Sequence, residues 1–146
     1  MAKTYQTNAF TQFGNTMSGL MIRLGVGPAG MHLLLTRGRK TGVLRSNPVN
    51  LIQYQGSRWL VAPYGQVGWV HNVRASGEAE VKRGSRAERV GLVEATPEEA
   101  APVLRAYLKQ LKLVVGPYFD VTPDSSDKAL IAEAPRHPVF RIVRPA

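Results

Sequence analysis

A short basic run between two apolar stretches is the chain's best candidate for an anion-binding site. Residues 37–42 read Arg-Gly-Arg-Lys-Thr-Gly, and Arg45 follows closely. The two glycines let the backbone bend so that N–H groups converge on an anion. Arg39, Lys40 and Thr41 add a guanidinium, an ammonium and a hydroxyl. The run predicts a phosphate cradle, with a solvated basic hairpin tip as the alternative. It is not a P-loop, which needs Gly-x-x-x-x-Gly-Lys-Ser/Thr before a long helix.

Two further groups of side chains suit a planar heterocycle. Asn47 can both donate and accept hydrogen bonds, as the edge of such a ring requires. Pro48 removes a ladder donor from a predicted strand, which indicates an edge, a bulge or a bend. Trp69 and Asn72 share one face of a short predicted helix. A strand bulge with a surface Asn47 and a Trp69 buried in the core are the alternatives left open.

Residue types that catalyse reactions on their own are poorly represented. The chain has no cysteine, and its three histidines, at positions 32, 71 and 137, lack metal-ligand spacing. It has no Gly-x-Ser-x-Gly sequence, and its 10 acids come too late in the chain to suggest paired carboxylates. We therefore expect no metal site. If the chain is an enzyme, a cofactor carries the reaction and the protein positions it.

The distribution of charge predicts an anionic partner. The net charge is +9, and residues 1–77 contain eight lysines and arginines but no aspartate or glutamate; Glu78 is the first acid. Chains that only need to stay soluble usually mix both signs. Nucleic acid, an anionic membrane surface and a phosphorylated small molecule are the candidates.

Length and composition predict one globular domain over residues 1–146. Hydrophobic residues make up 44% of the 146 and charged residues 20%. No apolar run approaches the ~18 residues of a membrane span, and the first residues lack the apolar stretch of a signal peptide. A cytoplasmic location is expected.

Periodicity predicts an α+β fold. An amphipathic helix is expected over about 8–24, a short helix over 69–75, and a long helix that starts with a capping box at Thr96 and stops at Gly116. Strands are expected over 31–36, 43–54, 58–63, 78–83, 86–95 and 139–143. Short strands joined by hairpins and tight loops predict a small closed or split β-barrel of antiparallel strands with flanking helices.

Three separated blocks resemble the deazaflavin-dependent nitroreductase and quinone reductase family of actinobacteria. The first is Gly-Arg-Lys-Thr-Gly at 38–42 with Arg-x-Asn-Pro at 45–48; the others are Trp-x-x-Asn-x-Arg-Ala at 69–75 and His-Pro-Val-Phe-Arg at 137–141. The resemblance implies a split β-barrel that binds the deazaflavin coenzyme F-420. It also implies hydride transfer from the reduced coenzyme to a quinone, a nitroaromatic or an activated alkene.

The resemblance also assigns residues. Arg39, Lys40 and Thr41 would hold the phosphate or the anionic tail of the cofactor. The ring would be lined by Arg45, Ser46, Asn47, Pro48, Val49, Ala62, Pro63, Tyr64 and Gly65. Trp69 and Asn72 would contact the ring or its polyol chain. We add Tyr118, which follows the long helix, as the hydroxyl that orients or protonates the acceptor.

Other functions stay open at this point. An FMN-dependent split-barrel oxidoreductase would have a similar phosphate cradle. A lipid carrier would explain the phenylalanines and methionines of the 8–24 helix, and that helix also leaves open peripheral contact with the inner face of the cell membrane. A nucleic-acid-binding module is not expected, because exposed aromatic side chains do not alternate with the basic ones. The sequence does not predict the oligomeric state.

Overall fold

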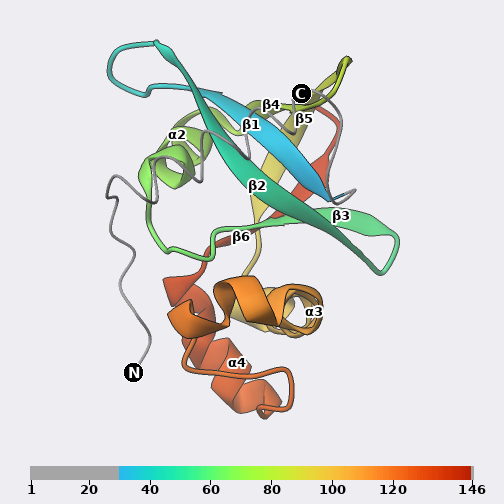
Figure 1. The fold of residues 1–146 in the computed structure, drawn as a ribbon. Helices are drawn as coiled ribbons and strands as arrows, with labels where there is room; N and C mark the ends of the chain where they lie inside the picture. The colour runs from blue at the N-terminus through green and yellow to red at the C-terminus, as the bar shows by residue number, and fades with distance from the viewer. Residues whose placement is uncertain (1–29, 146) are drawn as a thin grey trace.

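The computed structural model describes residues 30–145 (Figure 1). Its strands are β1 (Met31–Arg37), β2 (Leu44–Tyr54), β3 (Ser57–Val61), β4 (Glu78–Arg83), β5 (Arg86–Glu94) and β6 (Val139–Val143). Its helices are α2 (Gly68–Ser76), α3 (Pro97–Val115) and α4 (Asp127–Glu133), with the 3₁₀ turns η1 (Gly116–Tyr118) and η2 (Ala134–Arg136).

The strands form a closed antiparallel barrel in the order β1-β2-β3-β6-β5-β4, in which β1 also pairs with β4. β6 comes from the end of the chain and lies between β3 and β5. Every strand therefore has a neighbour on each side along at least part of its length. The predicted α+β class and antiparallel barrel are confirmed.

β2 changes its neighbour along its length. Its first part, from Leu44 to Asn50, pairs with β1, whereas Leu51 to Tyr54 pair with β3. Pro48 lies opposite Leu33 in the first part, away from the residues that pair with β3. A residue without an N–H fits there because it has a strand neighbour on one side only.

Two apolar clusters stabilise the fold. The barrel interior holds Leu34, Leu60, Val90 and Phe140 together with Trp69, Val70 and Val73 of α2. The second cluster joins the outside of β2, β3 and β6 to α3 and α4, and its most deeply buried members include Leu104, Tyr107 and Leu130. Figure 1 shows α3 and α4 as a separate layer beneath the barrel.

The helical layer begins where the sequence predicts. The Thr96 N–H donates to Glu99 Oε1 (2.9 Å), and the Glu99 N–H donates to Thr96 Oγ1 (3.2 Å), which is a capping box. These bonds hold the pKa of Glu99 below its ordinary value. Residues 118–137 contain the end of η1, α4 and η2.

Two expectations are not tested by this structure. The predicted helix over 8–24 lies outside the described residues, so the single domain over 1–146 also stays a prediction. Among the described helices, none has the length and hydropathy needed to cross a membrane.

Candidate functional site

A pocket of about 370 Å³ lies between the β1–β2 turn and α2. It is in the lower part of the size range of small-molecule sites, about 300–1,000 Å³. Its lining brings together most of the residues that the sequence analysis assigned to the cofactor. The lining residues are Gly38, Arg39, Lys40, Thr41, Arg45, Ser46, Asn47, Val67, Gly68, Trp69 and Asn72.

The basic turn is closed by its own backbone. The Gly38 N–H donates to the Val43 carbonyl (2.8 Å), and the Gly42 N–H donates to the Gly38 carbonyl (2.8 Å). Gly42 has φ 72°, a conformation that favours glycine. A side chain at Gly38 would bring a Cβ within 2.8 Å of Thr41 Oγ1. The backbone conformation therefore favours glycine at position 42, whereas a side chain at position 38 would displace the Thr41 hydroxyl.

Asn72 fastens this turn to the barrel. Its Oδ1 accepts from the backbone N–H of Arg39 (3.2 Å) and from the Arg39 guanidinium (3.1 Å). Its Nδ2 donates to the hydroxyl of Thr36 (3.2 Å), on β1. Asn72 and Thr36 are only 5% and 2% exposed. The amide of Asn72 therefore positions Arg39, and its contact with the ring stays a prediction.

The donor set of the pocket fits an anionic cofactor. Arg39, Lys40 and Arg45 are exposed and line it, whereas none of its described lining residues is acidic. Thr41 Oγ1 accepts from the Val43 N–H (3.2 Å), which leaves the hydroxyl hydrogen for an anion. Two guanidinium groups, an ammonium and a hydroxyl are suited to phosphate oxygens and carboxylates.

Trp69 belongs to both the core and the pocket. The residue is 7% exposed, and its ring lies 6.2 Å from the ring of Phe140, between centroids, inside the barrel. The same residue lines the pocket next to Val67 and Gly68. An aromatic ring held this way is a rigid apolar wall for a planar ligand.

The remaining residues assigned to the ring do not line this pocket. Val49 and Ala62 are buried in the barrel cluster, and Pro48 lies within β2. Pro63, Tyr64 and Gly65 form the turn that follows β3 and precedes Val67. Their contact with a ring stays a prediction.

Tyr118 also lies away from the lining residues of the pocket. Its ring meets that of Tyr64 edge to face, with 4.8 Å between centroids. This contact ties Tyr118 of η1 to the turn after β3. Its part in protonating an acceptor stays a prediction.

Three residues of the site were not assigned from the sequence. Val67 and Gly68 directly precede Trp69, so their place in the pocket could have been predicted from the expected start of the helix. The part played by Thr36 could not have been predicted, because its bond to Asn72 joins residues 36 positions apart. Within residues 30–145, no three His, Asp or Glu side chains gather to hold a metal ion.

Solved structures share the fold at low identity. A structure described as an F420-H2 dependent reductase (FDR-A) has a TM-score of 0.55 at 22% identity, over 80% of this chain and 96% of that one. A domain-swapped dimer has a TM-score of 0.56 at 17% identity, over 92% and 99%. A nimc/nima family protein from Clostridium acetobutylicum has a TM-score of 0.50 at 12% identity, over 88% and 81%. At these identities the similarity concerns the fold alone.

The family follows from the sequence itself. No curated protein sequence matches the chain. A family model described as F420H(2)-dependent quinone reductase matches residues 5–122, which is most of the chain. The block at 137–141 lies beyond that match. The chain belongs to the F420H(2)-dependent quinone reductase family, so it is a deazaflavin-dependent reductase whose cofactor is coenzyme F420.

Proposed function

We propose that the chain binds coenzyme F420 in the pocket between the β1–β2 turn and α2, and that it reduces a quinone. Nitroaromatics and activated alkenes are proposed as further acceptors. The observation that carries the proposal is the pocket itself, in which three cations and no described acid stand beside the wall formed by Trp69. When bound, the reduced deazaflavin supplies a hydride.

The residues of the pocket divide the work of binding. Arg39 and Lys40 neutralise phosphate or tail carboxylates, and the Thr41 hydroxyl donates to an anionic oxygen. Arg45 and Asn47, from β2, offer donors to the polar edge of the ring. Trp69 forms an apolar wall that excludes water from one side of the pocket.

The acceptor needs a different kind of group. A molecule that takes up a hydride gains negative charge, which a proton donor must neutralise or a hydrogen bond must stabilise. We propose that the Tyr118 hydroxyl does so. The position of Tyr118 against Tyr64, in the turn that leads to α2, supports this choice.

A fluorescence titration tests the proposed site. F420, FMN, FAD and a short oligonucleotide are added separately to the parent protein, to Lys40→Ala and to the control Lys109→Ala. Lys109 is exposed on α3 and does not line the pocket. We expect the Lys40 change to weaken F420 binding by ~1–3 kcal/mol, and added salt to weaken it further. FMN binding as tight as F420 binding would refute the assignment.

The cytoplasm, with contact to the inner face of the membrane, stays the proposed location. Val43 (51% exposed) and Leu44 (53% exposed) extend the basic turn. Apolar side chains beside cations suit an anionic membrane surface. Co-sedimentation with anionic but not with zwitterionic vesicles is expected, and equal sedimentation with both would exclude this charge-based contact.

A further inference from the structure

One wall of the candidate pocket is the end of the segment that leaves the barrel after β3. Val67 and Gly68 line the pocket, and Val67 is the N-cap residue of α2. Residues 63–66 come directly before them. Where this segment lies therefore fixes where the wall begins.

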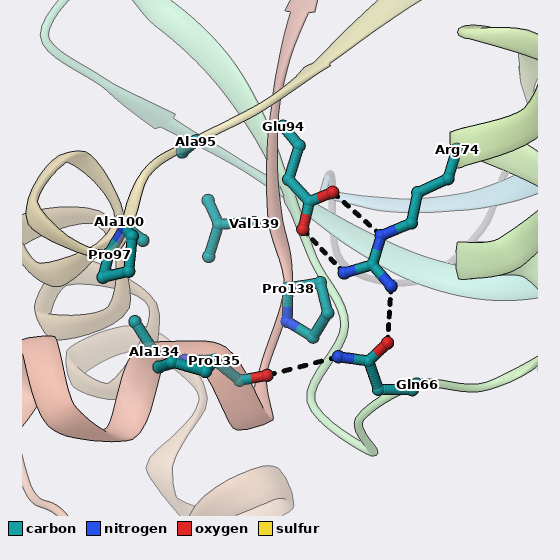
Figure 2. Close-up of a pocket in the computed structure, with 10 residues that line it drawn as sticks. All are labelled: Gln66, Arg74, Glu94, Ala95, Pro97, Ala100, Ala134, Pro135, Pro138 and Val139. Carbon is teal, nitrogen blue, oxygen red and sulfur yellow. Dashed lines mark hydrogen bonds and ion pairs between the residues drawn. The ribbon is translucent and has the colours of Figure 1, made fainter.

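The helical layer contacts that segment repeatedly. His137 Nδ1 lies 2.9 Å from the carbonyl oxygen of Pro63. Gln66 Nε2 donates to the carbonyl of Pro135 (3.3 Å), as Figure 2 shows. Gly65 passes so close to Arg136 that a Cβ there would lie 3.3 Å from its carbonyl oxygen. η2 and the residue that follows it, His137, thus run along the segment.

The barrel side also holds this segment, at the end that leads into α2. Gln66 Oε1 accepts from the Arg74 guanidinium, which also forms two hydrogen bonds with Glu94 (2.8 and 2.7 Å; Figure 2). Gln66 therefore bridges α2 and η2. At the other end of the segment, the Pro63 carbonyl contacts His137 of the helical layer.

The imidazole of His137 has a fixed orientation. It is 3% exposed, and its ring stacks on that of Phe119 with 3.7 Å between centroids. Its Nε2 lies 2.7 Å from Glu133 Oε2, and that carboxylate also accepts from the Asp120 N–H (3.2 Å) and from Arg136 (3.2 Å). The Pro63 carbonyl and the Glu133 carboxylate both accept hydrogen bonds, so Nδ1–H donates to the former and Nε2–H to the latter.

We propose that His137 is a positioning residue for the cofactor pocket. Its Nδ1–H holds the Pro63 carbonyl, and this keeps residues 63–66 against the helical layer and sets the Val67–Gly68 wall. The expected effect on cofactor affinity rests on the proposed function. The placement of the segment itself is independent of any ligand.

Two substitutions at His137 separate this role from a purely structural one. The amide nitrogen of asparagine reaches about the place of Nδ1, whereas that of glutamine reaches about the place of Nε2. His137→Asn therefore retains the donor to Pro63 and loses the contact with Glu133. His137→Gln does the reverse. Both variants lose the stacking on Phe119, so they form a matched pair.

The test measures hydrogen exchange at the Gly65 and Val67 amides in the ligand-free proteins, and then F420 affinity. These amides donate to the Ala62 and Gly65 carbonyls within the segment. We expect His137→Gln to exchange at least 10-fold faster there and to bind F420 about 10-fold more weakly. His137→Asn should stay within 3-fold of the parent in both measurements. Equal behaviour of the two variants, in either direction, would overturn the inference.

The outcomes also separate the inference from the proposed function. A parent protein that binds no F420 refutes the proposed function, while the exchange rates still test the position of the segment. If both variants unfold, the ring nitrogens of His137 are examined by NMR in the parent protein. A protonated Nδ1 whose hydrogen exchanges slowly supports the inference, and an unprotonated Nδ1 overturns it.

Discussion

Asn72 offers a direct test of how the basic turn is held, because its side chain can be changed in two ways. Its oxygen accepts from the Arg39 N–H (3.2 Å) and guanidinium (3.1 Å), and its nitrogen donates to Thr36 (3.2 Å). Asn72→Ala removes all three bonds. Asn72→Asp retains both bonds from Arg39, and the Thr36 hydroxyl can turn to donate to the new carboxylate.

The two variants should differ in stability. Alanine removes two neutral hydrogen bonds at ~1 kcal/mol each and the bond to the partly exposed guanidinium at ~1.5 kcal/mol or less. It also leaves the hydroxyl of Thr36, a residue only 2% exposed, without Asn72. We expect the free energy of unfolding to fall by ~2–4 kcal/mol for Asn72→Ala and by less than ~1.5 kcal/mol for Asn72→Asp.

Cofactor affinity should fall in both variants, for different reasons. Alanine releases the turn that carries Arg39, so the guanidinium loses its fixed position. Aspartate fixes the turn but forms an ion pair with Arg39 and adds a negative charge to a site for anions. Loss of one charge-assisted contact corresponds to ~1.5–3 kcal/mol, or about 10- to 150-fold in Kd.

Urea unfolding and fluorescence titration with F420 measure the two effects on the same proteins. Asn50→Ala, on β2 and outside the pocket lining, is the control. The reasoning is refuted if Asn72→Asp binds F420 as tightly as the parent. It is equally refuted if Asn72→Ala is as stable as the parent.

One further prediction concerns the proton donor. Tyr118→Phe should keep F420 affinity and lower kcat/KM for menadione by ~10-fold, about 1.4 kcal/mol of transition-state stabilisation; an unchanged rate would assign protonation to solvent.

The local features of the fold were predictable because their causes are local. The turn at 37–42 follows from its glycines, and the start of α3 follows from the spacing of Thr96 and Glu99. The position of Pro48 also follows from one missing N–H. Each of these depends on residues within a few positions of one another, which a sequence displays directly.

The contacts that position the site were not predictable in the same way. Asn72 meets Arg39 across 33 positions, and His137 meets Pro63 across 74. Periodicity places each residue on an element, but the closure of the barrel decides which elements meet. The side chain of Asn72 was predicted to contact a ligand. Its bonds to the turn follow from the packing of α2 against β1, which the sequence does not display.

The structure also shows which cations of the acid-free segment, residues 1–77, are paired with acids from later in the chain. The first half provides Arg58 and Arg74, and the later acids Glu88 and Glu94 pair with them. Arg89, Arg105 and Arg136 pair with acids of the later half. Among the ion pairs of residues 30–145, none involves Arg39, Lys40 or Arg45. Acids thus neutralise the arginines that join elements, whereas the cations of the turn keep their charge for an anion. An acid placed within reach of the turn would therefore cost affinity without any loss of fold, which is the outcome expected for Asn72→Asp.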